Sequence, residues 1–173
     1  MKLMKQVILI TYLCLIFQPT FSAETHYLDF KFILNSSDAG KKAQSSLKNQ
    51  LENGIENLKS TEKKLQKEEQ EIIQQKKVLS TDEYKKKISK LRENVSSLQK
   101  NRNALLETIA KKRSKARKEI LKKLNPIVKN YMQKNNIRIV LDKKHILLGD
   151  EELNITKDVM NMLNKELKTI NLN

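Results

Sequence analysis

Leu79-Ser80-Thr81-Asp82-Glu83 separates two long stretches of helical periodicity. Before it, an apolar residue recurs every seven positions, the spacing that keeps one stripe of a helix facing a partner: Leu51, Leu58, Leu65, Ile72 and Leu79. After it, apolar residues follow steps of four and three or multiples of that pattern: Tyr84, Ile88, Leu91, Val95, Leu98, Leu105, Ile109 and Ala116. Ser80 and Glu83 have the spacing of a capping box. The sequence therefore predicts two long helices with a turn at residues 79–83.

Two long helices joined by a turn predict an antiparallel hairpin, with an arm over residues 47–118 and a tip near residues 79–83. Pairing about the tip predicts these neighbours: Ile72 with Ile88, Leu65 with Val95, Leu58 with Arg102, and Leu51 with Ile109. The first helix has a polar seam, because four of the five positions that alternate with its apolar stripe are charged: Lys48, Glu62, Glu69 and Lys76. Gly54 costs about 1 kcal/mol relative to alanine inside a helix. We therefore expect a flexible arm.

The segments on either side of the arm predict a small body made of residues 24–46 and 119–173. Strands are predicted near residues 25–30, 137–142 and 145–148. A short helical turn at 31–34 leads to the first long helix at 37–79, and a last helix is predicted at 156–170 with Thr156 as its cap. Pro126 predicts a kink, or a new helix start capped by Asn125. The predicted fold class is mainly α with a small β body (α+β).

The predicted body buries little apolar surface. Three short strands and one helix are marginal in water, and their exposed edges need partners. We therefore expect the chain to form an oligomer.

The first 23 residues have the features of a secretory signal peptide. Lys2 and Lys5 precede an apolar run at residues 7–17, which Gln18-Pro19 ends. The run is shorter than the ~20 residues that span a bilayer. Cleavage after Ser22 or Ala23 would leave a mature chain that begins near Glu24. Cys14, the one cysteine of the sequence, lies in the segment removed, so disulfides would not stabilise the mature chain.

Positive charge is concentrated on the returning helix. The formal net charge of +15 becomes +13 without the two lysines of the signal peptide. Residues 82–134 hold seventeen basic and five acidic residues, a net charge of +12. Six basic residues lie within eight positions: Lys111, Lys112, Arg113, Lys115, Arg117 and Lys118. A solvated helix face is the simplest interpretation, but such a field also attracts anionic partners. These six are our candidate contact residues.

The order of elements resembles the Skp/OmpH family of periplasmic chaperones. The residues that carry the resemblance are Leu28-Asp29, Val140-Leu141-Asp142, and Ile155-Thr156 with Val159. The resemblance implies a homotrimer in the periplasm. It also implies an ATP-independent holdase that keeps unfolded outer-membrane proteins in a cavity between helical arms and prevents their aggregation. The six basic residues would then contact clients, and anionic lipid headgroups would be a further partner.

Other classes of function fit the sequence less well. His26 and His145 lie in predicted strands, no spacing resembles a metal site, and the three glycines form no phosphate loop. We therefore predict no enzyme, catalytic residue, cofactor or metal. Nucleic-acid binding through the basic run is an alternative, although the signal peptide and the scarcity of aromatic residues argue against it. A structural coiled-coil protein of the envelope is another, although the polar seam argues against a stiff spacer.

Overall fold

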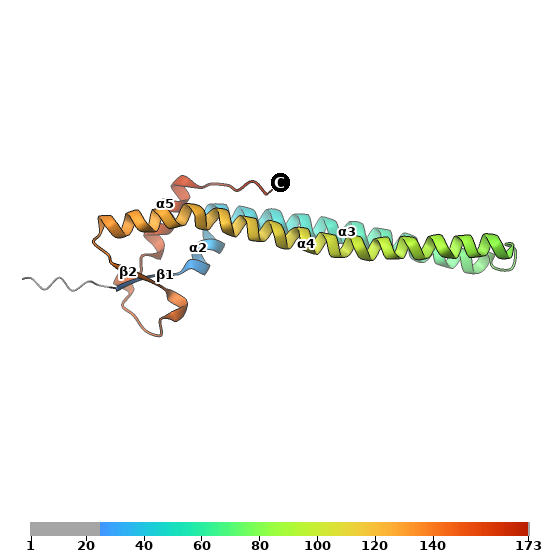
Figure 1. Cartoon of the computed structure of the whole chain (residues 1–173), viewed down its shortest axis with the longest axis horizontal. Helices are drawn as coiled ribbons and strands as arrows, with labels where there is room; N and C mark the ends of the chain where they lie inside the picture. Colours follow the sequence, from blue (N-terminus) through green and yellow to red (C-terminus); the bar gives the residue numbers. More distant parts are fainter. Residues whose placement is uncertain (1–24, 173) are drawn as a thin grey trace, which may run out of the picture.

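The computed structural model describes residues 25–172, so the predicted signal peptide lies outside the described residues. In chain order the elements are β1 (Thr25–Leu28), α2 (Phe30–Ser36), α3 (Asp38–Gln75), α4 (Thr81–Lys134), β2 (Ile139–Asp142), the 3₁₀ turns η1 (Lys143–His145) and η2 (Glu151–Leu153), and α5 (Thr156–Glu166). The hairpin of α3 and α4 projects from a small body that holds the remaining elements (Figure 1). The predicted mainly α fold with a small β part is confirmed.

The tip of the hairpin is closed by the predicted capping box. The Ser80 Oγ accepts a hydrogen bond from the Glu83 amide at 3.3 Å, and the Glu83 Oε2 accepts one from the Ser80 amide at 3.1 Å. Helix α3 ends at Gln75, four residues before the predicted end. The Lys76 ammonium lies 5.9 Å from the centre of the Tyr84 ring and links the two sides of the tip.

The helices of the arm pair in the antiparallel sense predicted from the sequence. Three polar contacts mark the pairing along its length: Gln75 with Lys87, Glu62 with Arg102, and Gln50 with Lys112. Along α4, Leu91 and Leu98 are buried, whereas Val95 is half exposed. Val95 therefore lies at the edge of the apolar stripe of α4 and not in its buried part.

Gly54 has a packing role that the sequence did not indicate. A Cβ added to Gly54 would lie 2.6 Å from both methyl carbons of Leu105. The Leu105 side chain therefore occupies the space that any larger residue at position 54 would need.

The body has one core, to which distant segments contribute. Strands β1 and β2 pair in parallel, with Thr25 opposite Ile139 and Leu28 opposite Asp142. Helix α4 runs through Pro126 as one helix, so the predicted new start at Asn125 is wrong. Its last turns place a wide apolar face against β1, α2 and α5. The buried core residues are Leu28, Ile33, Ile120, Leu124, Ile127, Ile137, Ile155, Val159 and Leu163.

The strand predicted at residues 145–148 is wrong. The Asp142 Oδ1 accepts a hydrogen bond from the Lys144 amide at 3.2 Å and starts η1, which runs to His145. Leu147 and Leu148 follow in irregular structure and are 96% and 90% exposed. Within residues 25–172 no strand pairs with them, and β propensity without a pairing partner does not make a strand.

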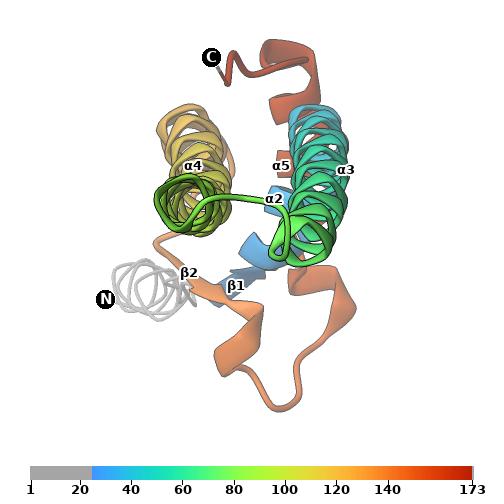
Figure 2. The same ribbon diagram turned by 90° about the vertical axis from the view of Figure 1, so that its right-hand side faces the viewer.

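The ends of three other elements also differ from the predictions. Strand β2 begins at Ile139 instead of residue 137. Strand β1 stops at Leu28, because Asp29 caps α2 by accepting a hydrogen bond from the Phe32 amide at 2.7 Å. Helix α5 begins at Thr156, which is its first residue rather than its cap. It ends at Glu166 instead of residue 170. Residues 167–172 then run back over the base of the arm, on the side opposite β1 and β2 (Figures 1 and 2).

Candidate functional site

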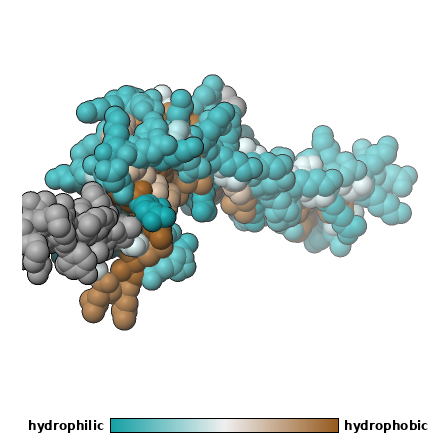
Figure 3. Space-filling model, turned by 60° about the vertical axis from the view of Figure 1, so that its left-hand side comes forward, coloured by the Kyte–Doolittle hydropathy of each residue, from teal (hydrophilic) through white to brown (hydrophobic). Residues whose placement is uncertain are grey.

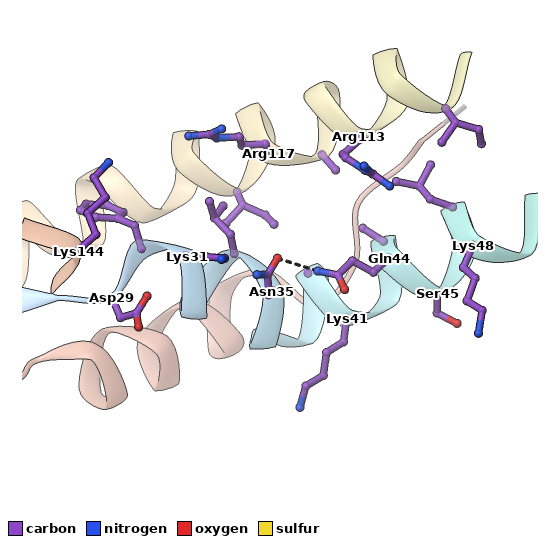
Figure 4. Close-up of a pocket in the computed structure, with 18 of the residues that line it drawn as sticks. Asp29, Lys31, Asn35, Lys41, Gln44, Ser45, Lys48, Arg113, Arg117 and Lys144 are labelled. Carbon is purple, nitrogen blue, oxygen red and sulfur yellow. Dashed lines mark hydrogen bonds between the residues drawn. The ribbon is translucent and has the colours of Figure 1, made fainter. Parts of the chain in front are cut away.

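An open groove of about 1270 Å³ lies where the arm joins the body. Helices α2, α3 and α4 and the junction of β2 with η1 form its walls, and Figure 4 shows its lining. Apolar side chains from the three helices contribute to this lining: Leu34, Ala43, Leu47, Leu51, Ile109, Ala116 and Ile120. Such a surface can accept apolar side chains of a partner.

Cations outnumber acids around this groove. Seven basic residues line it, from all four walls: Lys31, Lys41, Lys48, Arg113, Arg117, Lys143 and Lys144. The two acidic lining residues, Asp29 and Asp142, accept hydrogen bonds from backbone amides at the starts of α2 and η1. The groove therefore combines an apolar lining with a cationic rim, a combination that suits apolar chains carrying negative charge.

The bend between α2 and α3 places one wall of the groove. Ser37, which is fully buried, caps α3 by accepting a hydrogen bond from the Gly40 amide at 3.2 Å. Asn35 Oδ1 accepts a hydrogen bond from Gln44 Nε2 at 2.8 Å across the bend (Figure 4). These bonds hold α2 beside α3, so Lys31 of α2 lines the same groove as α3.

Only two of the six candidate basic residues line the groove. Arg113 and Arg117 are four residues apart and share one face of α4, with Ala116 buried beside them. Among the described residues, neither arginine forms an ion pair. Both guanidinium groups are therefore available to an anionic partner.

The other four candidates lie outside the groove lining. The Lys112 ammonium donates a hydrogen bond to Gln50 Oε1 at 2.7 Å and helps to join α4 to α3. The Lys111 ammonium lies 2.6 Å from Glu107 Oε1, and this contact lowers the pKa of Glu107. Lys115 and Lys118 are also absent from the lining. The predicted run is thus divided between two groove residues and four others.

Sequence reasoning missed the basic residues that other elements bring to the groove. Lys31, Lys41 and Lys48 are seven to ten residues apart in the sequence and line one groove only when α2 and α3 fold. The seven-residue spacing of Lys41 and Lys48 was the one available signal, because it places them on one face of a helix. Lys143 and Lys144 lie between two predicted strands and were not among the candidate contact residues.

Two further properties bear on the kind of site. Among residues 25–172, no three His, Cys, Asp or Glu side chains are grouped so that they could hold a metal ion. Over the same residues, no helix is both long enough and apolar enough to cross a membrane.

The three sequence motifs that carry the family resemblance meet at one joint in the body. The Ile155 amide donates a hydrogen bond to the Tyr27 carbonyl at 3.0 Å. The Asp29 amide donates one to Thr156 Oγ1 at 2.9 Å. Leu28 lies opposite Asp142 in the sheet. These motifs therefore join β1, β2 and α5 beneath the groove.

The fold and the groove define a class of protein: a long helical hairpin on a small α+β body, with a cationic groove at the base of the arm. A family profile described as outer membrane protein (OmpH-like) matches residues 25–163. The chain belongs to this OmpH-like family.

Comparison with solved structures shows that the fold occurs in other chains. Six chains match, among them a Caulobacter crescentus protein whose crystal structure is described as that of an OmpH-like outer membrane chaperone. The match has a TM-score of 0.81 and 18% sequence identity, and covers 89% of this chain and 90% of the other. The two chains therefore share a fold. Comparison with curated proteins gave no significant match.

Proposed function

We propose that this protein is an ATP-independent holdase chaperone of the periplasm, which binds unfolded outer-membrane proteins between its helical arms and prevents their aggregation. The observation that carries the proposal is the arm with its base groove, where an apolar lining and a cationic rim lie together on an OmpH-like fold. Many weak contacts of this kind can hold varied unfolded chains, whereas a shaped pocket selects one ligand.

The proposal includes export and assembly. A signal peptide over residues 1–23 would direct the chain to the periplasm, and the mature chain would begin near Glu24. The mature chain would form a homotrimer. Exposed apolar side chains at β2 and after it support this assembly: Ile139, Leu141, Leu147 and Leu148. Apolar side chains also project from the sheet side of the body in Figure 3. Such clusters, beside an unpaired sheet edge, favour contact with further chains.

Arg113 and Arg117 are the proposed electrostatic contacts to clients within the groove. Lys111, Lys112, Lys115 and Lys118 would contribute to the positive field that speeds encounters with acidic clients and anionic lipid headgroups.

The test is an aggregation assay. A urea-denatured outer-membrane barrel protein would be diluted into buffer with the mature chain at near-stoichiometric ratio and without ATP, and light scattering would be followed. We expect suppressed scattering and a soluble complex. Scattering equal to that of the client alone would contradict the proposal.

Nucleic-acid binding is the second candidate, and the net charge of +12 over residues 82–134 is the observation that favours it. Binding of this kind is electrostatic and weakens steeply with salt. Filter retention of duplex DNA at physiological salt separates the two functions, since a holdase should retain none.

A further inference from the structure

The C-terminal segment of residues 167–172, here called the tail, lies on the seam between the two arm helices. It leaves α5 and crosses the base of the arm as an extended segment (Figures 1 and 2). Leu172 is 6% exposed and belongs to a cluster with four seam residues: Ala43, Leu47, Ile109 and Ala116. Ile170 is partly buried against the same cluster, whereas Asn171 between them is exposed. The seam thus already binds a peptide segment whose apolar side chains alternate with a polar one.

Apolar contacts of Leu167, Ile170 and Leu172 hold the tail in place. An ion pair of 2.9 Å also joins Lys168 Nζ to Asp38 Oδ2, and both of these side chains are exposed to solvent. An exposed ion pair of this kind contributes little to stability. A competing segment with similar side chains can therefore displace it.

The seam under the tail is continuous with the groove. Ala43, Leu47, Ile109 and Ala116 contact the tail cluster and also line the groove. The tail lies on the side of α3 and α4 opposite the sheet, while the groove is walled by α2 and the end of β2. Lifting the tail would therefore expose the same apolar seam from its second side.

We propose that the seam under the tail is a binding site for one extended segment of an unfolded client, and that the tail occupies this site when no client is bound. The proposal rests on the holdase function proposed above. Strands of outer-membrane barrels alternate apolar and polar side chains. Ile170-Asn171-Leu172 has the same alternation, so the tail acts as an internal substitute for a client strand.

An internal competitor lowers the apparent affinity for a client. A tethered segment acts at a high effective concentration, and a client segment binds only the fraction of molecules whose site is open. Weakening the tail should therefore strengthen binding of a client segment.

The first experiment measures that affinity. The probe is a fluorescein-labelled peptide of about 10 residues with alternating leucine and serine, which is the length and pattern of one barrel strand. Two variants weaken the tail: Ile170→Ser with Leu172→Ser, and a chain that ends at Leu167. Thr169→Ser, at an exposed position of the same tail, is the matched control.

We expect the two tail variants to bind the peptide about threefold to tenfold more tightly, because the site is then open in every molecule. The control should bind the peptide like the unaltered chain. Unchanged or weaker binding by both variants would overturn the proposal.

The second experiment leaves the tail contacts in place. The mature chain has no cysteine, so Thr169→Cys allows one spin label on the tail. We expect the label to become mobile when the denatured barrel protein is added. A label that remains restricted in a complex containing client would overturn the proposal.

Failure of this proposal differs from failure of the holdase function. A chain that suppresses aggregation while its tail stays in place retains the proposed function and loses only the tail site. A chain that neither suppresses aggregation nor binds the peptide contradicts both.

Discussion

Gly40 sets how closely α2 can approach the start of α3. A Cβ added at this position would overlap the carbonyl oxygen of Leu34, which is a backbone atom and cannot rotate away. Alanine would favour the helix by about 1 kcal/mol, but overpacking costs about 1–3 kcal/mol. The steric effect should dominate, because the bend between α2 and α3 would have to open.

We therefore predict that Gly40→Ala lowers the free energy of unfolding, measured by urea denaturation, although it improves helix propensity. Gly54→Ala is the control, since its added Cβ meets only side-chain atoms of partly buried Leu105. The loss at position 54 should be smaller. Equal stability of Gly40→Ala and the unaltered chain would contradict this role of Gly40.

Ser80 and Glu83 stabilise the tip in a way that depends on pH. Hydrogen bonds from the Ser80 hydroxyl and then from the Ser80 amide hold the pKa of Glu83 below its ordinary value of 4.5. A carboxyl group whose pKa is lowered by folding stabilises the folded state above its unfolded pKa. The contribution is therefore complete above about pH 4.5 and is lost as the pH falls through the lower folded pKa.

We predict that Ser80→Ala raises the pKa of Glu83 toward 4.5 and removes about 1 kcal/mol of local stability at the tip. NMR titration of the Glu83 resonances would give the pKa, and amide exchange at residues 76–84 would give the local stability. Ser80→Thr keeps a hydroxyl and is the control. A Glu83 pKa that is equal in Ser80→Ala and the unaltered chain would refute the capping box as the cause.

At the scale of elements, the arm could be predicted from the sequence because its signals are local and repeated. The seven-residue stripe that includes Leu58 and Ile72, and the box of Ser80 and Glu83, each specify geometry within a few residues. The pairing of α3 with α4 then follows from the position of the turn. The pattern did not show that Val95, a member of the apolar stripe of α4, would be half exposed.

The elements that were mispredicted depend on distant parts of the chain. Ile146-Leu147-Leu148 has β propensity, but the described residues supply no neighbouring strand. The tail continues the apolar pattern of α5, yet packing of Leu172 on the arm draws it away from the helix. Most cations of the groove come from separate segments, so only Arg113 and Arg117 were among the candidates. Sequence periodicity does not report such contacts.

The basic face of α4 should control how fast clients are captured. We predict that Arg113→Glu with Arg117→Glu slows association with a denatured barrel protein, most strongly at low salt, where charges act over longer distances. Lys111→Glu with Lys118→Glu makes the same change in charge outside the groove and should slow capture less. Stopped-flow fluorescence at several salt concentrations would measure both rates. Association rates that stay unchanged at every salt concentration would exclude the electrostatic role.

At the scale of the whole molecule, the body exposes apolar residues that its own core does not use. Leu147 and Leu148 are almost fully exposed, and the sheet has only two strands. An exposed apolar surface of this kind favours contact with further chains. Such contact would also bury apolar area that the small core of the body cannot bury by itself.

We predict that Leu147→Ser with Leu148→Ser shifts the mature chain from the proposed trimer toward monomer without loss of helix content by circular dichroism. Val78→Ser, at an exposed apolar position of the tip, is the control and should leave the mass unchanged. A trimer that survives the double substitution would show that these leucines do not form the interface.

Assembly and client binding can be tested together by one measurement, the native mass of the mature chain alone and after addition of a denatured outer-membrane barrel protein. We predict a trimer that becomes a soluble complex of one trimer with its client, without ATP. A monomer whose mass does not change when the client is added would contradict both the proposed assembly and the proposed function.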